Sequence, residues 1–181
     1  MIYYLPLTVM PDIPVGNHFG SFGVKRKYSY HSGVDLYTEE GNDVYAIEPG
    51  IVTEINHFTG SKAGYPWWED TDCICIEGYS GVLVYGEIRV SDISLGKNIK
   101  KGECLGKVKR VLRHDKGKPT SMLHIMLLEH SIREDSIKSW KHNKLKPKGL
   151  LDPTPILIQC RINYSIMLTS RIRMDEYSFL P

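Results

Sequence analysis

An imidazole and a carboxylate lie four residues apart in the segment Tyr30–Leu36, at His31 and Asp35. In a straight strand these side chains would share a face but lie about 13 Å apart, too far to bind one ion whose ligands lie about 2 Å away. The chain must therefore bend at Gly33, which tolerates the backbone angles of a bend, before Val34–Tyr37 continues as a strand. The residue types and their spacing make this His-x-x-x-Asp a candidate part of a metal site.

A second imidazole, His124, lies in the apolar run Ser121–Leu128, which we interpret as a strand. Two-residue alternation predicts one face made by Met122, His124 and Met126 and an opposite face made by Leu123, Ile125 and Leu127. A single histidine on such a face is commonly a core residue. Together, however, His31, Asp35 and His124 supply two nitrogens and one oxygen, which leaves a tetrahedral zinc one open position, the pattern of catalytic sites.

A series of motifs occurs in the same order as in a known family: Phe19-Gly20, His31-Ser32-Gly33-Val34-Asp35-Leu36, Gly41-Asn42-Asp43-Val44-Tyr45-Ala46, Gly50-Ile51-Val52, Val84-Tyr85-Gly86-Glu87-Ile88, Lys101-Gly102-Glu103-Cys104-Leu105-Gly106, Met122-Leu123-His124 and Leu151-Asp152-Pro153-Thr154-Pro155. In these motifs the chain resembles the lysostaphin-type (LytM-like) zinc metallopeptidases. The resemblance implies an all-β, antiparallel, two-sheet domain of the duplicated hybrid-motif, barrel-sandwich-like kind. It also implies a zinc ion held by His31, Asp35 and His124, and hydrolysis of peptide bonds in bacterial peptidoglycan, a cell-wall polymer.

The chain departs from this family at both positions that match its catalytic histidines. The family's Tyr-x-His is Tyr85-Gly86-Glu87 here, and its His-x-His is Met122-Leu123-His124. Alternation along this strand predicts that Tyr85 and Glu87 share a face. Taken alone, Glu87 could simply form a surface ion pair with Arg89. The match implies instead that Glu87 could replace a lost histidine as general base or enter the coordination shell of the ion, and that Tyr85 could stabilise the oxyanion if its hydroxyl reaches the cleft.

The sequence leaves two alternatives open. Without an imidazole at Glu87 or Met122, the chain could be a catalytically degenerate, zinc-containing binding or structural module that recognises peptide or glycan without cleavage. His114, on a polar loop before the His124 strand, is a rival metal or catalytic group.

Composition and length indicate a soluble globular protein. The chain has 181 residues, of which 41% are hydrophobic and 24% charged, with a formal net charge of +2. These values do not indicate disorder, strong nucleic-acid binding or a membrane span, so the expected partner is a peptide rather than a nucleic acid or a membrane. We expect an N-terminal arm at 1–15, the metallopeptidase-like domain at 16–156 and a C-terminal extension at 157–181.

The segment Met1–Leu7 lacks a basic start and is interrupted by Pro6, which does not match a secretion signal. We therefore expect a protein that is cytoplasmic as synthesised and is either released by lysis or carried by a larger assembly. The cysteines at 73, 75, 104 and 160 are expected to be small core residues rather than disulfide partners, because an i, i+2 pair on one strand is badly placed for a disulfide.

The sequence also predicts the structure of three further segments. The long loop between His57 and Asp72 contains Trp67 and Trp68, which either wall a substrate groove or pack over the end of a sheet. Residues 131–140 are expected to form a short helix anchored by Trp140. Alternation of Ile162, Tyr164, Ile166 and Leu168 suggests an added strand or a partner-binding arm.

Overall fold

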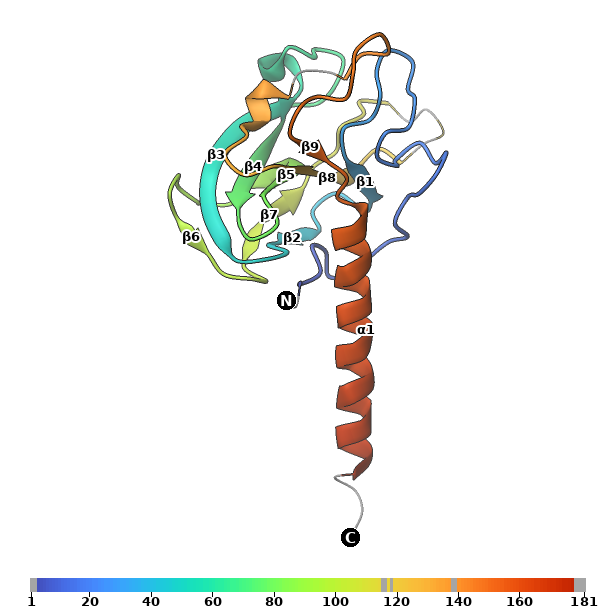
Figure 1. The fold of residues 1–181 in the computed structure, drawn as a ribbon, viewed down its shortest axis with the longest axis vertical. Helices are drawn as coiled ribbons and strands as arrows, with labels where there is room; N and C mark the ends of the chain where they lie inside the picture. Colours follow the sequence, from blue (N-terminus) through green and yellow to red (C-terminus); the bar gives the residue numbers. More distant parts are fainter. Residues whose placement is uncertain (1–2, 115–116, 118, 138–139, 178–181) are drawn as a thin grey trace.

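The computed structural model describes residues 3–114, 117, 119–137 and 140–177. The strands are β1 (Val34–Tyr37), β2 (Asp43–Tyr45), β3 (Gly50–Thr59), β4 (Thr71–Glu77), β5 (Val82–Val90), β6 (Asn98–Ile99), β7 (Cys104–Val108), β8 (Met122–Leu128) and β9 (Leu150–Leu151). Two 3-10 turns, η1 (Ser61–Ala63) and η2 (Glu134–Ser136), and one α-helix, α1 (Thr154–Tyr177), complete the described elements. Figure 1 shows the strands gathered at one end of the molecule and α1 extending from them as a rod.

The strands pair antiparallel in the order β1-β8-β5-β4-β3-β6, and β2 joins through β7 while β9 pairs with β8. Strand β5 changes partner along its length, since residues 82–86 pair with β8 and residues 88–90 pair with β7. The predicted all-β antiparallel fold is therefore confirmed.

Apolar side chains cover both faces of the central strands. In β8 the alternation is as predicted, since Leu123, Ile125 and Leu127 enter one cluster and Met126 enters the other. In β4 the isoleucines face the first cluster, whereas Cys73 and Cys75 face the second. Period-two alternation thus positions His124 on the same face as Met126, at the edge of the second cluster.

The predicted alternation in β5 is wrong beyond Gly86. Tyr85 and Ile88 both enter the first cluster, although they are three residues apart, because the β4–β5 register shifts between Asp72 and Ile74. Glu87 has φ 65°, a left-handed conformation that a residue with a side chain seldom adopts. This bulge turns Glu87 away from the face that Tyr85 occupies.

The C-terminal extension is a helix, so the expected strand is wrong for residues 157–177. Leu157 and Cys160 are buried against the first cluster, which fixes the start of α1 to the domain. Beyond them the helix extends away from the sheet (Figure 1). Large apolar side chains of α1 are exposed at Ile158, Ile162, Tyr164, Ile166, Met167 and Leu168. Among the described residues, no helix has the length and apolarity needed to cross a membrane.

Residues 131–137 form a single 3-10 turn, η2, instead of the expected short helix, and residues 138–139 lie outside the described part of the chain. Trp140 nevertheless packs against the second cluster, with its ring 5.9 Å from that of Phe22 and 5.0 Å from that of Tyr30. All four cysteines are free, and those at 73, 75 and 160 are buried as expected, whereas Cys104 is exposed.

Candidate metal centre

The structure brings His31, Asp35 and His124 together on neighbouring strands. Asp35 in β1 lies directly opposite His124 in β8. His31 precedes β1 and approaches the pair because the chain passes close to β8 at Gly33: a Cβ there would lie 2.4 Å from the Ile125 carbonyl oxygen and 2.5 Å from His124 Nε2. A residue without a side chain is therefore needed at this position.

Three ligand atoms converge in this arrangement. His31 Nε2 lies 3.2 Å from His124 Nδ1 and 3.1 Å from Asp35 Oδ1, and His124 Nδ1 lies 2.7 Å from Asp35 Oδ1. All three residues are buried. Within residues 3–114, 117, 119–137 and 140–177, this is the only group of three or more His, Cys, Asp or Glu side chains whose ligand atoms lie close enough together to hold one metal ion.

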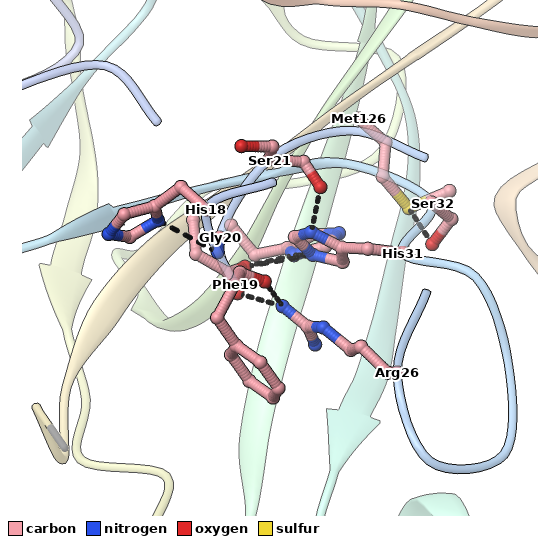
Figure 2. A network of polar contacts seen from close by, with 10 residues as sticks. His18, Phe19, Gly20, Ser21, Arg26, His31, Ser32 and Met126 are labelled. Atoms are coloured by element: carbon pink, nitrogen blue, oxygen red, sulfur yellow. Dashed lines mark hydrogen bonds and ion pairs between the residues drawn. The ribbon is translucent and has the colours of Figure 1, made fainter. Parts of the chain in front are cut away.

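The backbone fixes which nitrogen of His31 can act as a ligand. A carbonyl oxygen only accepts hydrogen bonds, so the 2.9 Å contact with the Ser21 carbonyl places a proton on His31 Nδ1 (Figure 2). With Nδ1 protonated, Nε2 either carries a second proton, which it donates to the Asp35 carboxylate, or presents a lone pair toward it. Two lone pairs repel at this separation unless a proton or a metal ion lies between them.

The pKa values of Asp35 and His124 are shifted in the direction that metal binding requires. Burial opposes ionisation of Asp35, but the charge of His31 and the hydrogen bonds from His124 and His31 outweigh it, so the pKa of Asp35 lies well below its usual value. Burial lowers the pKa of His124, against the opposing effect of Asp35. Around neutral pH the group therefore holds one carboxylate and a neutral His124 ring, the protonation states that bind metal.

Arg26 binds the second oxygen of the same carboxylate. Its guanidinium donates to Asp35 Oδ2 and, at 3.1 Å, to the carbonyl of Phe19, and it lies 4.5 Å from the centre of the Phe19 ring (Figure 2). Asp35 is thereby held with one oxygen toward the histidines and the other toward Arg26. Sequence reasoning missed Arg26, since it lies within an ordinary basic run, Lys25-Arg26-Lys27.

Glu87 lies in the electrostatic field of this site. It is buried, and its Oε2 atom has no hydrogen-bond partner. Burial, together with the negative charge of Asp35, raises the pKa of Glu87 well above its usual value, while Arg26 acts in the opposite direction. Burial of the carboxyl, the absence of a hydrogen-bond partner for Oε2 and the left-handed backbone each cost folding free energy. Such unfavourable features concentrate at functional sites.

The structure does not bring Tyr85 or His114 to the three ligands. The hydroxyl of Tyr85 accepts a 2.8 Å hydrogen bond from the Ile47 backbone N–H, and the ring is fully buried in the first cluster. The condition for an oxyanion role, a hydroxyl that reaches the cleft, is not met. His114 is exposed on its loop.

Tyr37 is a second residue that sequence reasoning missed, although alternation from Asp35 in β1 could have found it. Its ring lies 5.9 Å from that of His18, and a Cβ at Gly20 would touch it. Burial and the charges of Asp35 and Glu87 raise the pKa of Tyr37 to about 12, against the effect of Arg26. Its phenol therefore remains a hydrogen-bond donor at neutral pH.

The geometry of His31, Asp35 and His124 fits zinc. Ligands about 2.0 to 2.1 Å from a tetrahedral ion lie about 3.3 Å from one another, and the three separations are 2.7, 3.1 and 3.2 Å. With Nδ1 of His124 as a ligand, the proton resides on Nε2, the buried atom that has no partner within the protein. Two imidazoles and one carboxylate are also the donor set of known catalytic zinc sites.

Comparisons with known proteins agree with the fold. The model of peptidase family M23 matches residues 29–136, which is more than half of the chain. The chain therefore belongs to peptidase family M23, a family of zinc metallopeptidases. A comparison with curated protein sequences gave no match.

Solved structures of similar fold include cbpa from L. salivarius REN, with 19% identity, a TM-score of 0.60, and coverage of 90% of this chain and 98% of that one. The catalytic domain of the antimicrobial peptidase lysostaphin from Staphylococcus simulans has 18% identity, a TM-score of 0.54, and coverage of 77% and 90%. A mutant catalytic domain of the prophage-encoded M23 protein EnpA from Enterococcus faecalis has 16% identity, a TM-score of 0.51, and coverage of 83% and 95%. At these identities the likeness concerns the fold, which is that of the lysostaphin-type peptidases.

Proposed function

We propose that the protein is a zinc-dependent endopeptidase that cleaves peptide cross-links of bacterial peptidoglycan. The observation that carries the proposal is the convergence of His31 Nε2, Asp35 Oδ1 and His124 Nδ1 within 3.2 Å of one another. Family membership supports a peptidase-like role related to peptidoglycan. We propose further that the protein reaches the wall by lysis or as part of a larger assembly.

His31, Asp35 and His124 would hold the ion, which supplies Lewis-acid polarisation of the scissile carbonyl and activation of a water molecule. The Ser21 carbonyl orients the His31 ring, and Arg26 fixes Asp35 through its outer oxygen. Such outer contacts hold ligands in place and typically alter metal affinity about 10- to 100-fold when they are removed.

We assign to Glu87 the role of accepting the proton of the attacking water, because it is a buried carboxyl on which the charges of Asp35 and Arg26 act. Met122 cannot do so, because a thioether has no proton to exchange. In the protein without metal, burial favours the neutral form of Glu87, whereas a nearby cation favours the ionised form of a carboxyl. The bulge at Glu87 turns this side chain out of the face that Tyr85 occupies.

Digestion of purified peptidoglycan by the zinc-loaded protein tests the proposal. We expect release of new amino groups, and a loss of about 10² to 10⁴ in rate for Glu87→Gln, the usual contribution of acid–base assistance. The variant should retain its zinc. Unchanged activity in Glu87→Gln would exclude the base role and direct attention to His114.

The substitutions at Glu87 and Met122 favour a second candidate, a zinc-containing module that binds peptide or glycan without cleaving it. In that case the parent protein should show no hydrolysis, whereas Glu87→His combined with Met122→His should show some. Histidine is one of the residues that tolerates the left-handed conformation at position 87.

A further inference from the structure

Three aromatic rings gather on the loop that joins β3 to β4, which lies at the end of the sheet remote from α1 (Figure 1). We call Tyr65, Trp67 and Trp68 the aromatic platform. The ring of Tyr65 lies 5.9 Å from that of Trp67 and 5.4 Å from that of Trp68, and the two indoles lie 6.1 Å apart. Trp67 is 62% exposed and Tyr65 is 39% exposed, so these rings are not core residues.

The loop is held in place by its backbone. Tyr65 N–H donates to the Gly60 carbonyl at 2.7 Å, and Trp68 N–H donates to the Tyr65 carbonyl at 3.0 Å. Glu69 N–H donates to the Val111 carbonyl at 2.9 Å, and its own carbonyl accepts the Thr59 hydroxyl at 2.8 Å. The rings are therefore presented at a low cost in conformational entropy, which favours binding.

Contacts at both ends link the loop that carries the platform to residues at the candidate metal centre. On the β3 side, the ring of Phe58 lies 5.3 Å from that of His124. On the β4 side, Lys109 donates from its ammonium group to the Asp70 carbonyl and from its backbone N–H, at 2.9 Å, to the Glu87 carbonyl. These contacts fix the loop of the platform relative to the strands that carry the site.

The chemistry of the platform selects a neutral ligand with flat apolar faces. The adjacent charges of Glu69 and Arg113 pair at 3.8 Å and offset one another. The backbone N–H groups of Tyr65, Trp68 and Glu69 are already bonded within the protein, so a peptide cannot add there as a strand. The exposed faces of the aromatic rings are therefore the groups that remain available to bind a ligand. Sugar rings stack their C–H faces on such surfaces.

We propose that the aromatic platform binds the amino-sugar units of a peptidoglycan glycan strand and so positions the attached peptide at the metal centre. This inference rests on the proposed function for its choice of polymer. The site is separate from the metal ligands, so the two proposals can fail independently.

Calorimetric titration of the full, chelator-treated chain with a tetrasaccharide of N-acetylglucosamine tests the platform without requiring catalysis. We expect saturable binding, and a loss of about tenfold in affinity, equal to about 1.4 kcal/mol, for Trp67→Ala and for Tyr65→Ala, because each variant lacks one stacking surface. Tyr79→Ala is the matched control, because Tyr79 is 66% exposed on the β4–β5 turn and should leave affinity unchanged.

No binding by the parent chain, or equal binding by Trp67→Ala, overturns the proposal, and circular dichroism of each variant confirms that it is folded. Weaker binding of a cross-link peptide by Trp67→Ala, with no effect on the tetrasaccharide, overturns it in favour of a peptide subsite. Glu87→Gln should bind the tetrasaccharide normally. Sugar binding that depends on Trp67 in a protein without hydrolysis would contradict only the proposed endopeptidase.

Discussion

The sequence could identify some of the groups that form the candidate metal centre, but not all of them. His31, Asp35 and His124 could be proposed from residue type and motif order, and the structure places their ligand atoms together. The Ser21 carbonyl and Arg26 could not, because a backbone acceptor leaves no trace in residue type and Arg26 lies in a loop with no periodicity. Tyr85 was assigned by position, but its hydroxyl bonds to Ile47 in the core.

The raised pKa of Glu87 predicts a pH-dependent loss of stability in chelator-treated protein. Below its usual value near 4.5 the carboxyl is protonated in both the folded and the unfolded chain. Between this value and the higher pKa of the folded chain, Glu87 ionises in the unfolded chain but stays protonated in the folded chain. The free energy of unfolding therefore falls as pH rises through this range, by about 1.4 kcal/mol for each unit of difference in pKa. Glu87→Gln lacks this titration, so it should become more stable relative to the parent between pH 5 and pH 8.

Urea unfolding at several pH values measures this difference. Glu103→Gln is a suitable control, because the hydrogen bond from the Lys100 backbone and that from Lys97 lower the pKa of Glu103. Its contribution is lost only as pH falls below the usual value, so this variant should show no slope between pH 5 and pH 8. A parent and a Glu87→Gln variant with parallel pH profiles would contradict the burial of a titrating carboxyl.

At the scale of elements, strands with plain alternation were predictable and the irregular strand was not. In β8 the two faces follow the pattern of the sequence. In β5 the sequence Tyr85-Gly86-Glu87 gives no signal for a bulge in which Glu87, and not Gly86, has positive φ. The bulge is imposed by tertiary structure, since β5 changes partner from β8 to β7 at this point.

Close approach of β1 and β8 predicts that Gly33→Ala disrupts the metal centre. The added methyl group would lie 2.4 Å from the Ile125 carbonyl oxygen, where neither the backbone nor the His124 ring can yield without moving the ligands. We expect a loss of roughly 1 to 3 kcal/mol in the free energy of unfolding, together with weaker zinc binding. Chemical denaturation and calorimetry measure the two effects.

Gly96→Ala provides the comparison, since a Cβ there meets nothing within 4 Å but must adopt φ 76°. It should cost stability through the backbone alone and leave zinc affinity unchanged. If both alanine variants bind zinc as the parent does, the close packing of Gly33 on His124 is not needed for the site.

At the scale of the whole molecule, the domain could be predicted and its extension could not. Residues matched by the family model form the antiparallel sheet. The segment 157–177 has apolar residues at alternate positions, as a strand has, but also at Leu157 and Cys160, which are three apart and lie on one face of a helix. The burial of Leu157 and Cys160 on one face accounts for a helix here in place of a strand.

Truncation of α1 should separate the contribution of its packed start from that of its C-terminal part. Removing residues 170–181 leaves Leu157 and Cys160 in place, so we expect the melting temperature to change by no more than about 2 °C. Removing residues 154–181 deletes both buried side chains and should destabilise the domain by several kcal/mol. Thermal unfolding followed by circular dichroism at 218 nm, in the region of the β signal, distinguishes these outcomes. Equal loss of stability in both variants would mean that residues 170–181 also support the fold.

The zinc content of the chain tests the central claim most directly. After removal of metal by a chelator, titration with zinc should show one ion per chain for the parent and for Glu87→Gln. His124→Ala should lose this binding, whereas His57→Ala, at an exposed histidine paired with Asp72, should retain it. Equal zinc binding by the parent and by His124→Ala would contradict the assignment of His31, Asp35 and His124 as the metal ligands.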